Sequence, residues 1–195
     1  EVFDQVPLDA RERILAAGET LFRQRGYRNV TMRDIAEEVG IRQASLYYHF
    51  PSKEQLFITV TEQVFERHRN GLQQAIHEAG SDLRTQLHAA SHWFISQPPL
   101  NFLSLMHTDV PALSEENIQR LSLMAEQSVF DPLRQAFIAA QERGQIREVK
   151  PNILAGLFLS AMDGMNFAST LPGTSPKEVT ASEVISVLLD GLQPE

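Results

Sequence analysis

Apolar positions along this chain recur with the period of an α-helix, about 3.6 residues, and the strict alternation of a β-strand is nearly absent. Asp9 and Glu12 have the spacing of a capping box, and the apolar residues after them fall on one helical face up to Gly26. Thr31 and Asp34 repeat that spacing before a second, shorter helix. Helices are expected over residues 9–25, 31–39, 43–49, 52–78, 81–97, 100–109, 115–143, 151–169 and 176–192.

The breaks between these segments are prolines and glycines, as expected for helix ends. Pro132 falls inside the expected helix 115–143 and should kink or divide it. The pattern therefore predicts an all-α protein of about nine helices. Three short helices joined by tight turns predict a helix-turn-helix domain over residues 1–53, and residues 54–195 should form a larger helical domain.

The third short helix has an unusual surface. Leu46 and Phe50 lie four residues apart and should face a small core. The opposite side carries Gln43, Ala44, Tyr47 and Tyr48. A glutamine can pair with adenine, an alanine can touch a thymine methyl group, and the hydroxyls of Ser45 and the tyrosines can reach bases or phosphates. This pattern alone leaves DNA contact and a plain solvent-facing surface both open.

The formal net charge of −8 looks unfavourable for contact with DNA. However, residues 23–53 hold six basic and three acidic residues, so the negative charge lies mostly in the remainder. The chain contains no cysteine, which excludes disulfides and thiolate zinc sites and favours a reducing cytoplasm. The longest apolar run, 152–163, is too short to cross a bilayer, so no membrane association is expected.

Three stretches together resemble the signature of the TetR family of bacterial transcriptional regulators: Thr31–Ala36, Val39–Ile41 and Ser45–Leu56. The resemblance covers residues 11–57 closely and implies a homodimeric repressor on a pseudo-palindromic double-stranded operator. In the family's pattern, helix 31–39 and the start of helix 43–49 contact bases. The end of helix 43–49 and the start of helix 52–78 contact phosphates. Two positions depart from it: Arg42 replaces a small capping residue, and Pro51 replaces a lysine. The implied DNA-contacting residues are Thr31, Arg33, Arg42, Gln43, Ala44, Ser45, Tyr47, Tyr48, His49 and Lys53.

The resemblance also implies a dimer built from the last two long helices. Their apolar stripes agree with this, although such stripes are equally consistent with a core inside one chain. The expected interface residues are Leu154, Leu157, Phe158, Ala161, Met165, Val184 and Leu188.

The family builds an effector cavity between the helices of the C-terminal domain. Here that region is rich in methionine and aromatic residues, which suit a small, largely apolar or aromatic molecule, and binding should release the operator. The alternative is that these side chains simply fill the core. The expected ligand-binding residues are Trp93, Phe94, Phe102, Met106, His107, Phe130 and Phe137.

Other classes find less support. The sequence has no GxSxG, P-loop, dinucleotide-binding glycine pattern or HExxH, so no enzyme and no cofactor are expected. His88 and His92 are four residues apart, as in a metal pair, but no nearby carboxylate completes a ligand set, and a polar stripe is favoured. A DNA-bundling protein should be basic throughout, and this chain is not.

Overall fold

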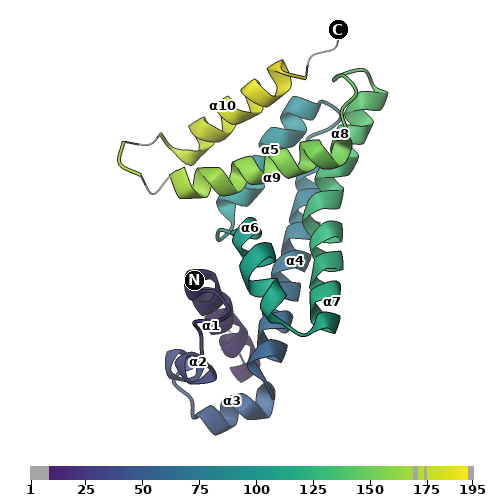
Figure 1. Cartoon of the computed structure of the whole chain (residues 1–195). Helices are drawn as coiled ribbons and strands as arrows, with labels where there is room; N and C mark the ends of the chain where they lie inside the picture. Colours follow the sequence, from purple (N-terminus) through teal and green to yellow (C-terminus); the bar gives the residue numbers. More distant parts are fainter. Residues whose placement is uncertain (1–8, 169–170, 174, 193–195) are drawn as a thin grey trace, which may run out of the picture.

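The computed structural model describes residues 9–168, 171–173 and 175–192, and all regular elements in these ranges are helical (Figure 1). The N-terminal domain contains α1 (Ala10–Arg25), α2 (Met32–Val39) and α3 (Gln43–His49). The long helix α4 (Lys53–Glu78) continues from it into the body of the molecule. The body contains α5 (Leu83–Ser96), α6 (Phe102–Ser104), α7 (Glu115–Ala125), α8 (Asp131–Glu142), α9 (Pro151–Ala168) and α10 (Lys177–Asp190), with the short turns η1 (Leu105–Asp109), η2 (Val110–Ala112) and η3 (Glu126–Phe130).

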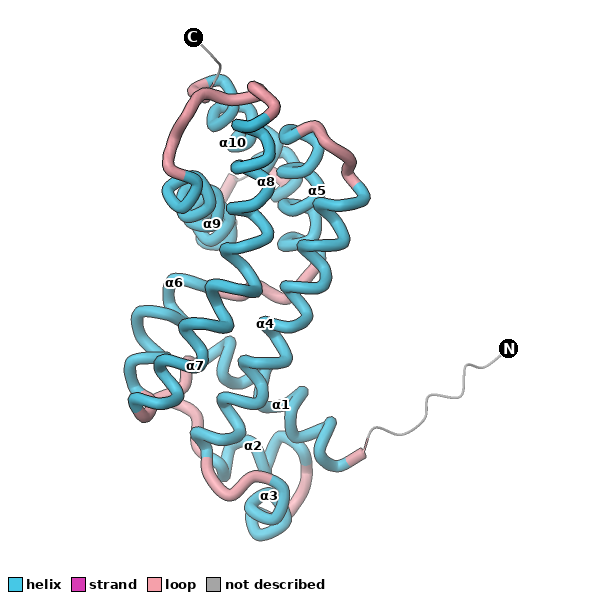
Figure 2. Tube along the Cα trace, turned by 90° about the vertical axis from the view of Figure 1, so that its right-hand side faces the viewer, coloured by secondary structure: helices cyan, strands magenta, loops and turns pink. Residues whose placement is uncertain are grey.

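The all-α prediction is confirmed. Because α7, η3 and α8 follow one another without a break, they form the single helical segment expected over 115–143, and the described part of the chain has the nine expected segments. The boundary predicted at residue 53 stays a prediction, since α4 starts there and belongs to both parts (Figure 2).

Side-chain caps explain where the first helices begin. The carboxylate of Asp9 accepts the backbone N–H of Glu12, and the Glu12 side chain accepts that of Asp9. Thr31 and Asp34 form the same reciprocal pair at the start of α2. Ser52 Oγ accepts the N–H of Gln55, which starts α4. Each cap satisfies N–H groups that have no partner inside the helix.

The predicted irregularity at Pro132 takes the form of a π-helical turn. Proline has no N–H to donate and its ring clashes with the carbonyl four residues earlier, which for Pro132 is that of Ser128, inside η3. The wider π turn moves that carbonyl aside. Pro111 has the same relation to η1, where the carbonyl four residues earlier belongs to His107. The two wide turns border the same part of the body.

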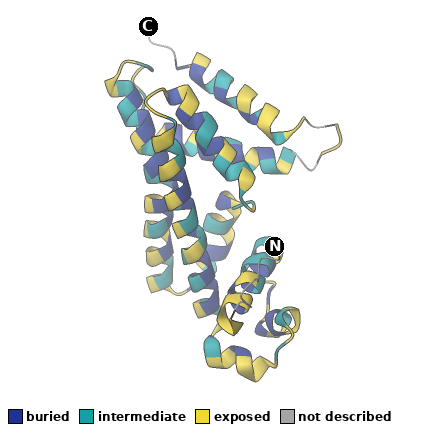
Figure 3. Ribbon diagram, turned by 180° about the vertical axis from the view of Figure 1, so that it is seen from behind, coloured by how far each residue is buried: buried dark blue, intermediate teal, exposed yellow. Residues whose placement is uncertain are grey.

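The core runs from the N-terminal domain along α4 to the far end of the molecule, where α5, α8, α9 and α10 pack together (Figures 1 and 3). Within it, the indole of Trp93 on α5 lies directly on Gly71 of α4. Its Nε1–H donates to Nδ1 of His68, at 3.3 Å. These three residues fix α5 against α4.

Candidate DNA-binding surface and ligand sites

Helix α3 presents the surface expected from the sequence. Leu46 is fully buried and Phe50 is 2% exposed, so both anchor α3 to the domain core. Tyr48 is 87% and Tyr47 45% exposed, which is unusual for large aromatic side chains. His49 is partly buried, and its ring packs edge-on against Tyr48. The remaining predicted contact residues of this segment are also exposed: Arg42, Gln43, Ala44 and Ser45.

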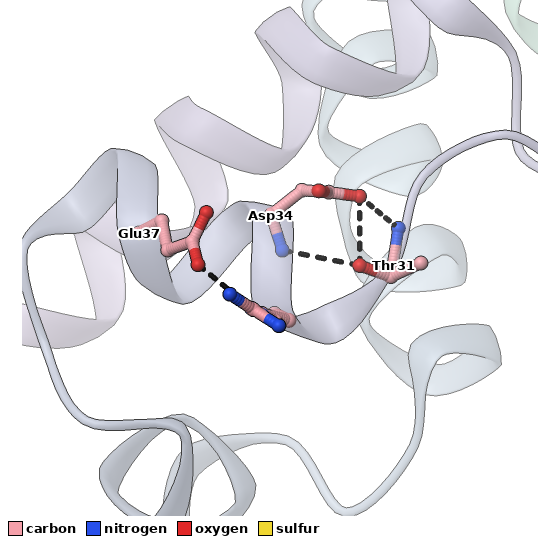
Figure 4. A network of polar contacts seen from close by, with 4 residues as sticks. Thr31, Asp34 and Glu37 are labelled. Atoms are coloured by element: carbon pink, nitrogen blue, oxygen red, sulfur yellow. Dashed lines mark hydrogen bonds and ion pairs between the residues drawn. The ribbon is translucent and has the colours of Figure 1, made fainter.

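Helix α2 supports α3 and has its own exposed charges. The Thr31 hydroxyl donates to Asp34 Oδ2 at 2.7 Å and accepts the Asp34 N–H at 3.1 Å, so the predicted capping role of Thr31 is confirmed (Figure 4). These hydrogen bonds hold the pKa of Asp34 below its ordinary value. Arg33 pairs with Glu37 one turn later, with Nε and Oε1 2.8 Å apart, and both side chains are mostly exposed. The guanidinium of Arg33 is therefore accessible from solvent, and a new contact to it would break only the weak, exposed ion pair with Glu37.

Lys53 has a different environment from the one expected. Its Nζ donates to the carbonyl oxygens of Tyr27 and Val30, at 2.9 and 3.0 Å, and lies 4.2 Å from the centre of the Tyr27 ring. Burial lowers the pKa of Lys53. Two of its three N–H donors thus hold the loop between α1 and α2. A phosphate contact through the third stays a prediction.

The predicted ligand-binding residues divide into two groups. Phe102, Met106, His107 and Phe130 line a groove of about 430 Å³ that includes residues of both π turns. Trp93, Phe94 and Phe137 do not line this groove. Phe137 is fully buried, so it fills the core. Trp93 and Phe94 both pack against the imidazole of His68.

His68 is a buried residue that the sequence analysis did not single out. It is 1% exposed, and burial lowers its pKa to about 4, aided by nearby Arg67 and opposed by Glu19. Its imidazole is therefore neutral at pH 7, with Nδ1 as acceptor from Trp93 and the proton on Nε2. Nε2 has no hydrogen-bond partner in the described part of the chain.

A second cavity, of about 400 Å³, lies where the N-terminal domain meets the body. It is bounded by the C-terminal half of α1, the middle of α4 and the segment 98–109. Asp109 closes one end, where its Oδ1 accepts the backbone N–H of Tyr27 at 2.9 Å. Gly26 has a φ of 75° and leaves room for this carboxylate, because a Cβ there would come within 3.2 Å of Oδ1. The local sequence pattern does not predict this cavity, because nothing in it places α1 beside residues 98–109.

The predicted dimer residues are not all available to a partner. Leu154, Phe158 and Met165 are at most 6% exposed within one chain, so for them the core alternative holds. Leu157 is 52% exposed, and Ala161, Val184 and Leu188 are partly exposed. The large apolar side chains most exposed on α9 and α10 are those of Val187, Phe167, Ile153 and Leu157. The outer face of α9 thus includes Leu157 of the predicted set, whereas Leu154, Phe158 and Met165 face the core of the same chain.

Within the described ranges, no cluster of three or more histidines, aspartates and glutamates is placed to hold a metal ion, and none of the helices there meets the length and apolarity needed to span a bilayer.

Comparison with known proteins agrees with the geometry of α1 to α4. Residues 14–60 match the sequence model of the "Bacterial regulatory proteins, tetR family". Residues 14–60 therefore have the sequence of the DNA-binding part of this family. The HTH-type transcriptional repressor KstR2 of Mycolicibacterium smegmatis is 46% identical over 50 residues, 26% of this chain and 24% of that protein. IcaR of Staphylococcus epidermidis, a negative regulator of a biofilm operon, is 38% identical over 55 residues, 28% of this chain and 30% of that protein. The chain therefore matches less than a third of the length of either relative.

Solved structures extend the likeness to the whole fold. AibR in complex with isovaleryl coenzyme A and operator DNA has a TM-score of 0.78 at 22% identity, over 92% of this chain and 97% of that one. PfmR, a TetR-family regulator of Thermus thermophilus, has a TM-score of 0.69 at 26% identity, over 93% of this chain and all of that one. The arrangement of a helix-turn-helix domain and a helical body is therefore shared.

Proposed function

We propose that this protein is a sequence-specific DNA-binding repressor of the TetR family, that it acts as a homodimer, and that a small, largely apolar molecule in its body releases the operator. The observation that carries the proposal is the surface of α3. A short helix held rigidly by Leu46 and Phe50 presents glutamine, serine and two exposed tyrosines, in the segment that matches the family. KstR2 and IcaR, which match this chain in part, are described as repressors.

The homodimer is proposed to form on the outer face of α9 together with α10. Ile153, Leu157 and Gly164 are spaced as one face of α9, and Val187 extends the exposed apolar surface on α10. Gly164 has no neighbouring atom within 4 Å of an added Cβ, so a partner helix could approach it closely. Both helices lie at the end of the molecule far from α3 (Figure 1). Two copies joined there would leave both recognition helices free for DNA.

The effector is proposed to bind in the groove between the two π turns. Its walls include Phe102, Met106 and Phe130, and the guanidinium of Arg134 is already paired with Glu126 and Asp131. Such a groove favours apolar area over charge, at about 25 cal/mol per Å² removed from water. Related folds have been crystallised with isovaleryl coenzyme A and with choline, so this architecture can hold a small molecule.

The test begins with selection of bound sequences from a random double-stranded DNA pool, followed by affinity measurements on the selected site. Gln43→Ala should change the preference at one base pair by about 1–3 kcal/mol. Gln135→Ala, an exposed glutamine on α8, is the matched control and should bind every site as the unmodified protein does. Failure to enrich any sequence would refute the proposed function. Equal binding by Gln43→Ala to all single-base variants would refute the role of this residue in base reading.

A further inference from the structure

The cavity between the N-terminal domain and the body, hereafter the junction cavity, has an apolar floor. Phe57, Val60 and Val64 of α4 line it, with Phe22 of α1 and Leu105 of η1 opposite. Its volume of about 400 Å³ is within the range of small-molecule sites. It is separate from the effector groove, because the two share no lining residue.

The charged residues that line the junction cavity are unbalanced. Four are arginines and two are carboxylates, and both carboxylates already have partners. Glu19 accepts two hydrogen bonds from Arg67, at 2.6 and 3.3 Å, and Asp109 accepts the Tyr27 N–H. Arg25 and Arg28, in contrast, make no ion pair within the part of the chain that is described, and their charges act only at longer range, on Asp34 and Asp109 respectively. The rim therefore has cationic groups available to a ligand.

We propose that the junction cavity is a second ligand site, and that it binds an organic carboxylate with an apolar tail. The tail lies against the floor formed by α4, and the carboxylate is held by the arginines of the rim. A neutral apolar molecule would cover the apolar floor but leave the positive charge of the arginines without a counter-charge. A small inorganic anion would pair with the arginines but leave the apolar floor exposed to water. The amphipathic anion satisfies both.

The position of the site gives it a regulatory consequence, which rests on the proposed DNA-binding function. Its walls come from α1 and from residues 98–109, which the Asp109–Tyr27 hydrogen bond joins at one end. A ligand that contacts both walls adds to that single bond and fixes the N-terminal domain against the body. Occupancy should thus change operator affinity, in either direction, by favouring one spacing of the recognition helices.

The experiment uses the full chain without DNA, with decanoate as the probe and 1-decanol as its neutral counterpart. Binding is followed by the thermal shift at matched concentrations, and the decanoate affinity is then measured by calorimetry. Decanoate should raise the melting temperature more than 1-decanol does. Arg25→Gln and Arg28→Gln should each weaken decanoate binding about tenfold, as expected for one charge-assisted hydrogen bond. Arg143→Gln, the same change at an exposed position outside the cavity, should leave the affinity within about twofold.

Two filling variants locate the bound probe. Ser104→Trp places an indole in the junction cavity and should abolish decanoate binding, whereas Met106→Trp fills the effector groove and should not. Equal shifts with decanoate and 1-decanol, unchanged affinity in both arginine variants, or loss of binding only in Met106→Trp would each overturn the proposal. Because no DNA is present, these results are independent of whether the protein binds an operator. Operator affinity with and without decanoate is measured afterwards.

Discussion

Alanine at Gly71 should destabilise this protein, although the same exchange inside a helix normally stabilises it by about 1 kcal/mol. An added Cβ would overlap the six-membered ring of Trp93, far inside the ordinary contact distance of about 3.5–4.0 Å. The indole must therefore move. Its movement costs about 1–3 kcal/mol in packing, and loss of its hydrogen bond to His68 leaves a buried acceptor unpaired, at about 1–3 kcal/mol more. After the gain in helix propensity, the net loss should be about 3 kcal/mol, or roughly 6–12 °C in melting temperature.

Urea unfolding followed by circular dichroism measures this loss, at one fixed protein concentration because a dimer's stability depends on concentration. Trp93 is the chain's single tryptophan, so its fluorescence reports the displacement directly, as a shift of the emission to longer wavelength. Gly156→Ala on α9 is the control, since its Cβ would meet only Phe130 ring atoms at 3.8 and 4.0 Å. That exchange should stabilise by up to about 1 kcal/mol. If Gly71→Ala is as stable as the unmodified protein and its emission is unchanged, the close contact between α4 and α5 is not as described.

Three further results are expected. The buried His68 is neutral in the folded protein, so its contribution to the free energy of unfolding is complete above its ordinary pKa of 6.5 and is lost as the pH falls toward 4. In urea unfolding, the free energy of unfolding of the unmodified protein should therefore fall between pH 7 and pH 5 by about 2 kcal/mol more than that of His68→Phe. Leu157→Asp should give monomers in analytical ultracentrifugation, because it puts a charge into the proposed apolar interface. Leu123→Asp, which changes a similarly exposed leucine on α7, should remain dimeric. If both variants are dimers, the proposed interface on α9 is wrong. Glu54 accepts hydrogen bonds from the hydroxyl and the N–H of Ser114, and these hold the pKa of Glu54 low. The decrease in melting temperature caused by Glu54→Ala should therefore be full at pH 7 and become smaller below about pH 4, where the carboxylate is protonated. A decrease that does not depend on pH would contradict this.

Local sequence patterns were sufficient to predict the helices and the exposed surface of α3. Thr31 and Asp34 act on each other through three hydrogen bonds, so a spacing of three residues in the sequence fixes the start of α2. Leu46 and Phe50 are on one side of α3 because residues four apart share a helical face. The exposed residues of α3 follow from these two anchors.

Contacts between distant segments could not be predicted in the same way. Helix α9 is apolar on more than one side, so its pattern does not tell which side meets the chain's own core; Leu154 turned out to face the core, and Leu157 faces outward. The junction cavity depends on α1 lying beside residues 98–109, which are more than 70 residues away in the sequence. Lys53 was expected at a phosphate because of its place in the family pattern, yet two loop carbonyls already bind its ammonium group.

The contact between Trp93 and Gly71 divides α4 unequally. From Lys53 to Gly71 the helix has no proline, and its length of about 27 Å follows from the rise of about 1.5 Å per residue. If this part of α4 rotates as a rigid rod about its contact with Trp93, a tilt of about 7° moves its N-terminal end, next to α3, by about 3.3 Å. The rise between stacked base pairs is about 3.4 Å. A tilt of about 7° would thus displace α3 by about the rise of one base pair.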